Sequence, residues 1–294
     1  MKISVITPFY EGADYMQQYI QCMEANWDNL KQQGYELEVI LVNDSPWKKL
    51  EAEASNNQYI KVITNPENKG IHYSRVSGLS QATGDYVMFL DQDDLIEKDA
   101  LVKMAVALTK SQCDLIIANA NLEQANGEYL QWYRTESHWD LVWDLSTYLN
   151  IGIQIISPGQ CLIKRDAIPE FWKENLVRVN GADDYYLWLL MMAAGKKAAV
   201  LKQPEYIHKY TGTNLSADTT ATDGSVYDFL ELLHDCDYFK QDDIIALHEM
   251  ITYKAQFRKS NLMGKIGCSL ANLGIFIANL KFKKATKTGY GFNR

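Results

Sequence analysis

The stretch GDYVMFLDQDDL, residues 84–95, carries an apolar run that ends abruptly in acidic residues. The run Tyr86–Leu90 is short and continuously apolar, as expected of a strand that is buried on both faces of a sheet. The next four residues, Asp91-Gln92-Asp93-Asp94, contain three carboxylates. Like charges repel one another, so their crowding at the end of a buried strand predicts a binding site rather than part of the core.

Similar apolar runs recur through the first 120 residues and alternate with segments that suit helices. We expect strands at residues 3–7, 37–42, 59–64, 85–90 and 114–118, and helices at residues 14–33, 71–82 and 97–110. This alternation predicts an α/β fold with a mixed, mainly parallel, Rossmann-like central sheet and helices on both faces. Ligands of such sheets bind beyond the carboxyl ends of the strands, which here carry Thr7, Asn43, Asp44 and the acidic cluster.

The totals describe a globular protein with free thiols. The 294 residues are 47% hydrophobic and 22% charged, which excludes disordered and collagen-like classes. The five cysteines are scattered and form no CxxC pair, so they predict neither a zinc site nor a disulfide framework. The first ten residues, MKISVITPFY, lack the apolar stretch of a signal peptide, and we expect a cytoplasmic protein.

The charge is distributed unevenly along the chain. The net charge is −8, yet no Asp or Glu follows Glu249, whereas nine Lys and Arg residues do. The apolar segment 262–280 is interrupted by Lys265, Asn272 and Asn279, which makes it a poor transmembrane span. An interfacial helix at an anionic membrane surface fits better, so we expect a peripheral protein at the inner face of the cell membrane. The alternative is a solvated basic face.

The acidic cluster has the chemistry of a site for a hard divalent cation. If the chain is extended there, the side chains of Asp91 and Asp93 point to the same side. Oxygen ligands without His or Cys suit Mg²⁺ or Mn²⁺, which share their coordination sphere with waters and phosphates. The alternative is a set of turn or helix-capping aspartates, because Asp94 and Asp99 flank an expected helix start.

Four motifs occur in order over roughly residues 1–120. They are ISVITPFY (3–10), VNDS (42–45), NKG (68–70) with Arg75 and Gly78, and GDY (84–86) leading into the acidic cluster. Together they resemble family 2 glycosyltransferases, which have the GT-A fold and are inverting enzymes that use nucleotide sugars. Four motifs in order are more specific than any one alone.

The resemblance implies a donor site at the sheet edge. Asp44 would read the nucleotide base, with Arg75 nearby, Asp91 would bind the ribose, and Asp93 with Asp91 would hold Mn²⁺ or Mg²⁺ on the diphosphate. From the residues alone, Asp44 is equally a helix cap before Pro46, and Arg75 a partner in a surface ion pair. The implied donor-nucleotide residues are Thr7, Pro8, Tyr10, Asp44, Arg75, Asp91 and Gln92.

A second block, GADDYYL at residues 181–187, resembles the Glu-Asp motif that opens a helix in this family. The resemblance implies that Asp184 is the catalytic base and that Asp183 stands in for the Glu. A base is needed because a sugar hydroxyl is a poor nucleophile until its proton is removed. The alternative is a pair of aspartates at a helix N-terminus.

A third segment departs from the family. Residues 208–211 (HKYT) and 214–216 (NLS) resemble its Tyr-Arg-x-His and Asn-x-Ser elements, with Lys209 in place of Arg and Thr211 in place of His. A phosphate contact from Lys209 remains possible as a point charge.

The sequence therefore predicts a metal-dependent inverting glycosyltransferase. We expect it to move a sugar from a nucleotide diphosphate sugar, specifically a UDP-sugar, to a hydroxyl of a growing surface polysaccharide or lipid-linked glycan. The GT-A domain would span residues 1–220, with a nucleotide-binding half (1–120) and an acceptor and catalytic half (121–220), followed by a helical C-terminal extension (221–294). The aromatic stretch 129–143 is either an acceptor platform or core. We expect no nucleic-acid partner.

Two rival functions remain open at this stage. A phosphoryl-transfer hydrolase also places a DxD motif after a strand, but it gives no role to Asp44 or Asp184. A non-catalytic sugar-nucleotide binding protein would keep Asp44 and Asp91 and would tolerate the loss of Asp184.

Overall fold

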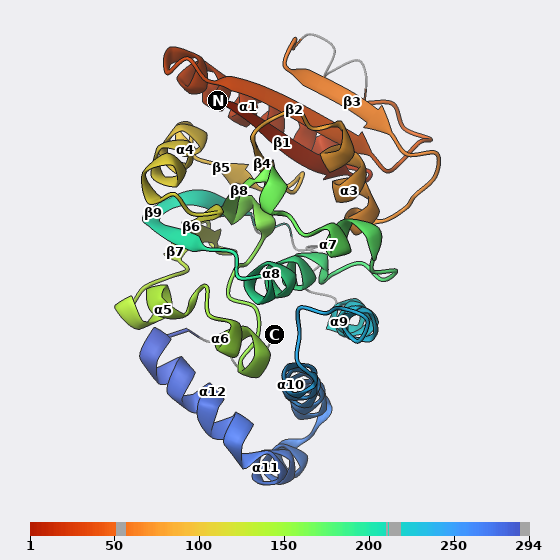
Figure 1. Cartoon of the computed structure of the whole chain (residues 1–294), viewed down its shortest axis with the longest axis vertical. Helices are drawn as coiled ribbons and strands as arrows, with labels where there is room; N and C mark the ends of the chain where they lie inside the picture. The colour runs from red at the N-terminus through yellow and green to blue at the C-terminus, as the bar shows by residue number, and fades with distance from the viewer. Residues whose placement is uncertain (51–56, 210, 212–218, 289–294) are drawn as a thin grey trace. The chain divides into compact units, whose positions relative to one another are not determined.

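The computed structural model describes residues 1–50, 57–209, 211 and 219–288 (Figure 1). The chain forms two compact units that are interleaved along the sequence. Unit 1 comprises Met1–Gln131, Ile156–Leu176 and Lys196–Asn214. Unit 2 comprises Trp132–Ile155, Val177–Gly195 and Leu215–Arg294. The division into residues 1–220 and 221–294 stays a prediction.

Unit 1 holds a sheet of nine strands within the described residues, in the order β3-β2-β1-β4-β8-β6-β9-β5, with β7 paired to β6. The pairs β3-β2, β2-β1, β1-β4 and β6-β9 are parallel, whereas β8 runs antiparallel between β4 and β6. This arrangement confirms the predicted mixed, mainly parallel sheet. The strands are β1 (Lys2–Phe9), β2 (Glu36–Asn43), β3 (Ile60–Thr64), β4 (Tyr86–Phe89), β5 (Leu95–Ile96), β6 (Leu115–Glu123), β7 (Tyr129–Gln131), β8 (Cys161–Lys164) and β9 (Ala198–His208).

The helices of unit 1 pack on the sheet and on one another. They are α1 (Met16–Gln32), α3 (Ile71–Gln81), α4 (Ala100–Ser111) and the short α7 (Glu170–Glu174). Helix α3 packs on β1 and β2, while α1 contacts β2 and α4 (Figure 1). The close approach of α3 depends on Gly78, because a Cβ there would lie 2.3 Å from Ile6 Cγ2 and 3.0 Å from Val42 Cγ2. Residues 3–9 of β1 and 39–43 of β2 are buried without a break, which accounts for the mostly apolar runs in these strands.

The unit 2 helices depart from one expectation. The segment 262–280, expected as one interfacial helix, is split at Asn272, whose φ of −123° and ψ of 46° are not helical. Trp132 and Tyr133 of the aromatic stretch are buried, whereas Tyr129 is 54% exposed, so the choice between core and acceptor platform stays a prediction. The helices are α5 (Glu136–Leu141), α6 (Leu145–Asn150), α8 (Asp183–Ala193), α9 (Thr219–Leu233), α10 (Gln241–Lys259), α11 (Leu262–Ala271) and α12 (Leu273–Thr286).

Candidate functional site

The carboxyl ends of β1, β2 and β4 bring the predicted donor residues of unit 1 to one edge of the sheet. Phe9 pairs with Asn43 across β1 and β2, and Ile6 pairs with Phe89 across β1 and β4. The residues that follow these strands, Tyr10, Asp44 and Asp91, therefore leave the sheet on the same side. The sequence-based expectation that polar groups gather at this edge is met by the register.

Asp44 is buried at the end of β2 and holds the loop that precedes α3. Its Oδ1 accepts hydrogen bonds from Asn65 Nδ2 (2.7 Å) and from the backbone N–H of Lys69 (2.8 Å). Its Oδ2 accepts one from the backbone N–H of Gly70 (2.9 Å). The carboxylate thus fixes the backbone around residues 65–70 beside the sheet edge, and its role toward a nucleotide base stays a prediction.

Gln92 clamps the backbone of Tyr10 across the ends of β4 and β1. Its Oε1 accepts from the Tyr10 N–H (2.9 Å), and its Nε2 donates to the Tyr10 carbonyl (3.1 Å). Gly12 makes room for this amide, because a Cβ there would lie 2.2 Å from Gln92 Oε1. The Tyr10 side chain is left 48% exposed, with its ring edge-on to Trp47 at 6.2 Å.

Thr7 and Pro8 lie inside β1 rather than beyond its end. Both residues are buried, and the Thr7 hydroxyl is 2.6 Å from the Tyr19 hydroxyl. Of the three residues predicted from the first strand to line a donor pocket, Tyr10 alone is exposed. Thr7 and Pro8 shape the edge through the backbone and through packing.

The acidic cluster is a turn and not an extended segment, which corrects the reasoning from strand alternation. The backbone N–H of Asp94 donates to the carbonyl of Asp91 (3.2 Å) and closes the turn. In a turn, residues two apart are no longer forced to one side. Asp93 nevertheless lies close enough to Asp94 and Asp91 for their charges to raise its pKa.

Asp91 is the most tightly braced member of the cluster. Its Oδ1 accepts from the buried Arg75 Nη2 at 2.6 Å, and its Oδ2 accepts from the Ser157 hydroxyl at 3.1 Å. Arg75 is therefore a partner of Asp91 rather than part of a surface ion pair. Burial raises the pKa of Asp91, Arg75 opposes that rise, and the nearby Asp94 adds to it.

Asp94 ties the cluster to the end of β9. Its carboxylate accepts from the Tyr206 hydroxyl and from the backbone N–H of Lys209 (2.9 Å), and it lies 3.1 Å from His208 Nδ1. Burial, followed by the charges of Asp94 and Asp91, raises the pKa of Tyr206 well above its ordinary value. Sequence reasoning assigned Asp94 only an alternative capping role, because its partners lie more than a hundred residues away along the chain.

Asp93 is the carboxylate of the cluster that the fold leaves unbraced. No hydrogen bond from another residue in the described part of the chain reaches its side chain. Burial first, and then Asp94 and Asp91, raise its pKa to about 7, with His208 opposing them. A carboxylate kept half-buried among like charges is poised to bind a cation.

The donor set at Asp93 fits a hard divalent ion that keeps much of its own water. Among the described residues, no group of three or more His, Cys, Asp or Glu side chains is arranged to hold a metal. Mg²⁺ and Mn²⁺ do not need such a cage, since one or two carboxylates plus substrate phosphates and water complete their sphere. Asp93 supplies such a carboxylate, whereas both oxygens of Asp91 are engaged by Arg75 and Ser157.

The predicted catalytic pair belongs to unit 2 and lies in the first turn of α8. The helix N-cap is Ala182, so neither aspartate occupies the capping position. Ala182 is fixed by its backbone N–H, which donates to Ser225 Oγ (3.0 Å). Asp183 is buried (2% exposed), whereas Asp184 is less buried and accepts from the Tyr185 N–H (2.7 Å).

The segment after β9, whose sequence departs from the family pattern, is described only in part. His208 Nδ1 is 3.1 Å from Asp94 Oδ1, and Lys209 Nζ donates to Glu123 Oε1 (2.8 Å). Thr211 is half-buried. The other residues of that comparison, Tyr210 and Asn214–Ser216, lie outside the described residues.

Comparisons with known proteins agree on one family. Residues 4–172 match the family described as Glycosyl transferase family 2. "Glycosyltransferase GlyA" of Streptococcus pneumoniae is 27% identical over 148 residues, which are 49% of this chain and 20% of that protein. "Putative teichuronic acid biosynthesis glycosyltransferase TuaG" of Bacillus subtilis is 30% identical over 129 residues, covering 42% of this chain and 49% of that protein. The matched segments thus span a fifth to a half of these relatives.

Solved structures share the fold. A crystal structure of S. aureus TarS 1–349 in complex with UDP-GlcNAc superposes with a TM-score of 0.60 and 20% identity. The match covers 97% of this chain and 82% of that one. At 20% identity, the structural similarity to TarS shows the GT-A fold alone. Family membership rests instead on the family match, which covers more than half of the chain. This protein is therefore a member of glycosyl transferase family 2, a glycosyltransferase.

Proposed function

We propose that this protein transfers a sugar from a UDP-sugar, with a divalent metal ion and with inversion, to a hydroxyl of a growing surface polysaccharide or lipid-linked glycan. The observation that carries the proposal is the state of Asp93. Its carboxylate is half-buried and unbraced beside the fixed Asp91, and its pKa is raised to about 7. Such a group gains most from a bound cation that carries phosphate.

The identity of the donor is supported by the structural relative. TarS has been crystallised with UDP-GlcNAc and with UDP, and its fold covers nearly all of this chain. In our proposal the nucleotide lies along the edge formed by Tyr10, Asp44 and Asp91. We propose a glycan acceptor because the name of one relative places that protein in teichuronic acid biosynthesis.

The metal would be held by Asp93, with Asp91 oriented by Arg75 and Ser157 toward the ribose side. A bound divalent cation supplies positive charge to the diphosphate oxygens as the bond to the sugar breaks. Arg75 keeps Asp91 in one rotamer through the 2.6 Å contact. Asp94, occupied by Tyr206, His208 and Lys209, keeps the turn rigid and is not available as a ligand.

Asp184 is the proposed general base. The acceptor oxygen forms a bond to the anomeric carbon while the bond from that carbon to the diphosphate oxygen breaks, and UDP leaves. The acceptor proton passes to a carboxylate oxygen of Asp184. Attack from the face opposite the leaving group inverts the anomeric centre.

The test separates catalysis from binding. Asp184→Asn should lower turnover by roughly 10²–10⁴-fold, the usual contribution of a general base, and should leave UDP affinity within about twofold of wild type. Asp93→Asn should instead abolish the enhancement of UDP binding by Mn²⁺ in isothermal titration calorimetry. The exposed Asp140 of α5 provides the matched control, since Asp140→Asn removes the same charge from unit 2.

Two outcomes would contradict the proposal. Wild-type protein that neither binds nor turns over any UDP-sugar with Mn²⁺ or Mg²⁺ would exclude the donor class. Binding without turnover in the wild type, unchanged by Asp184→Asn, would make the protein a sugar-nucleotide binder.

A further inference from the structure

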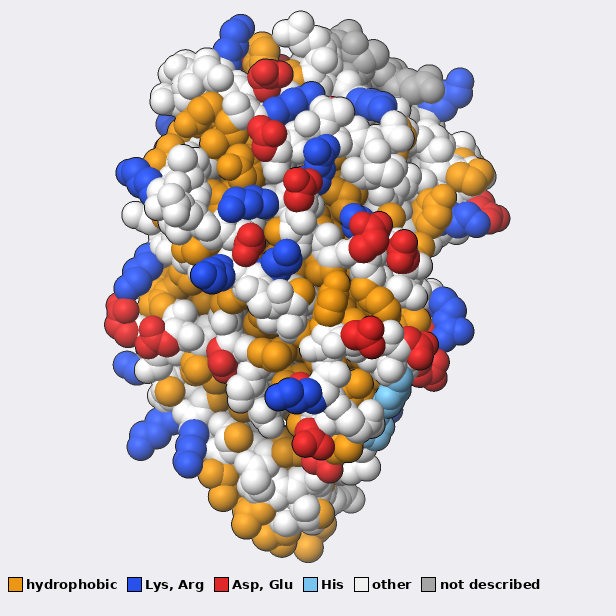
Figure 2. All heavy atoms as spheres, viewed as in Figure 1, with side chains coloured by type: hydrophobic (Ala, Val, Ile, Leu, Met, Phe, Trp, Pro, Cys, Tyr) orange, Lys and Arg blue, Asp and Glu red, His pale blue; other side chains and the backbone are white. Residues whose placement is uncertain are grey.

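The outward face of α11 and α12 is apolar and exposed. On α11 the exposed side chains recur at the three- and four-residue spacing that lines one helix face, and the same holds on α12. In Figure 2, hydrophobic side chains gather over α11, in the lowest part of the view. The docking face, as we call it, consists of Leu262, Met263, Ile266, Leu270, Leu273, Ile277 and Leu280, which are 41–75% exposed.

The opposite faces of these helices are firmly packed within unit 2. Phe282 of α12 is 5% exposed, with its ring edge-on to His138 of α5 at 5.8 Å. Thr135 Oγ1 donates to the Ala285 carbonyl (3.0 Å), and Lys265 of α11 lies 5.3 Å above the Phe257 ring of α10. The docking face is therefore exposed on helices whose other faces are held by contacts within unit 2.

Positive charge borders the docking face. Lys284 continues the line of Leu273, Ile277 and Leu280 along α12, since these residues are spaced by four, three and four positions. Lys281 and Lys283 are exposed on either side of that line. The sequence after Glu249 contains no acidic residue that would offset them. An apolar stripe ending in lysines is complementary to a surface of acyl chains and anionic headgroups.

The helices have the composition of a membrane segment but not its geometry. Within the described residues, no single helix is both long and apolar enough to cross a bilayer. Taken together, α11 and α12 meet the length and composition criteria, but they are bent by 104° at the break between them. Two short helices that each expose a line of apolar side chains, joined at such an angle, suit a position along an interface.

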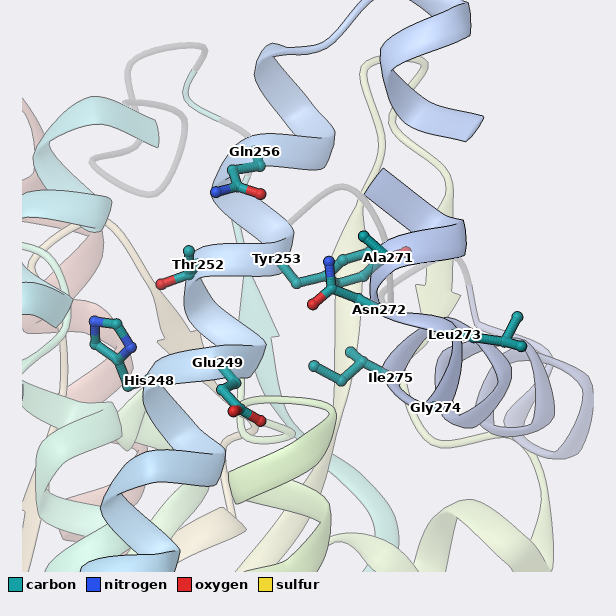
Figure 3. Close-up of a pocket in the computed structure, with 10 residues that line it drawn as sticks. All are labelled: His248, Glu249, Thr252, Tyr253, Gln256, Ala271, Asn272, Leu273, Gly274 and Ile275. Carbon is teal, nitrogen blue, oxygen red and sulfur yellow. The ribbon is translucent and has the colours of Figure 1, made fainter. Parts of the chain in front are cut away.

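A hollow beside the break at Asn272 is another place where a lipid headgroup could bind. Its volume is about 550 Å³, and it is lined by His248, Glu249, Thr252, Tyr253 and Gln256 of α10 and by residues 271–275 (Figure 3). The carboxylate of Glu249 disfavours an anionic headgroup there. Leu273, a member of the docking face, points away from α10 in the same view.

We propose that the docking face seats this protein on an anionic lipid bilayer. The apolar side chains enter the boundary between headgroups and acyl chains, while Lys281, Lys283 and Lys284 contact lipid phosphates. A second copy of the chain is the weaker occupant, because a self-complementary interface would bring these lysines together. The inference is independent of the sugar-transfer reaction, since it uses no donor-site residue.

The test is sedimentation of the full chain with vesicles of phosphatidylcholine, alone or in equimolar mixture with phosphatidylglycerol. We expect binding to the mixed vesicles and much weaker binding to phosphatidylcholine. The double variant Met263→Gln and Leu270→Gln should bind the mixed vesicles at least tenfold more weakly, because two large apolar side chains no longer enter the bilayer. Replacing Lys281 and Lys284 with Gln should weaken binding about 30-fold, from about 1 kcal/mol per lysine.

Matched controls remove similar groups elsewhere. Ile245 of α10 is 46% exposed off the docking face, so Ile245→Gln should bind like wild type, as should Lys110→Gln on α4. Equal binding by the wild type and both double variants would overturn the proposal. So would absence of binding by the wild type, or a wild-type dimer in sedimentation velocity that the Met263 and Leu270 substitutions dissociate.

Discussion

Replacing Asp93 with Asn should stabilise the metal-free protein while removing the part of its donor binding that depends on Mn²⁺. Burial, followed by the charges of Asp94 and Asp91, raises the pKa of Asp93 from the ordinary 3.8 to about 7. Between those values the unfolded chain has released the proton while the folded chain retains it, so stability falls as the pH rises from about 4 to 7. Above pH 7 the folded protein carries the full cost of a charged, half-buried carboxylate. Asn keeps the shape and lacks the charge.

The size of the effect follows from the shift. Each pKa unit corresponds to about 1.4 kcal/mol, so the shift from 3.8 to about 7 sets an upper limit of about 4 kcal/mol. Solvent screens part of this, because the side chain is only half-buried, and we expect about 1–3 kcal/mol at pH 8. For a chain of this size that corresponds to a melting temperature higher by roughly 2–10 °C.

The assay is thermal and urea unfolding of wild type and Asp93→Asn in EDTA from pH 4.5 to pH 8. The difference between the two proteins should be largest at pH 8 and should shrink steadily toward pH 4.5. Asp166, whose side chain is 96% exposed, gives the control Asp166→Asn, for which no such pH-dependent difference is expected. A variant that is less stable than wild type at pH 8, or a difference independent of pH, would refute the electrostatic reasoning.

Two further substitutions probe the framework around the site. Gly78→Ala should lower the free energy of unfolding by about 1–3 kcal/mol, because the new Cβ would lie 2.3 Å from Ile6 Cγ2 and force α3 away from the sheet. Urea unfolding measures this loss, and an unchanged free energy of unfolding would mean that α3 is loosely packed. Tyr206→Phe should cost about 1–3 kcal/mol by removing the donor to the buried Asp94, with a corresponding fall in the urea midpoint; an unchanged midpoint would show that Asp94 is satisfied without it.

Sequence reasoning succeeded where the pattern is local. The parallel strands β1, β2 and β4 each contain a buried, mostly apolar run, and polar residues follow β2 and β4 closely in the chain, so Asp44 and Asp91 were identifiable as edge residues. The helix α8 was likewise recognisable from its apolar sequence and its opening aspartates.

The remainder depends on contacts between distant segments. The antiparallel strand β8 enters the sheet between β4 and β6, which no local pattern reveals. Ser157 and Tyr206 reach Asp91 and Asp94 across 66 and 112 residues, so their part in the acidic cluster carries no local signature. The break at Asn272 was also missed, although a polar residue inside an apolar run was its visible trace.

The interleaving of the two units has a consequence for how this protein can change. The backbone passes from one unit to the other after Gln131, Ile155, Leu176 and Gly195, among other points. A single stop codon or gene-fusion junction cannot separate the units, since each is assembled from discontinuous pieces of one polypeptide. Exchanging either unit as a whole would therefore require several simultaneous junctions in the chain.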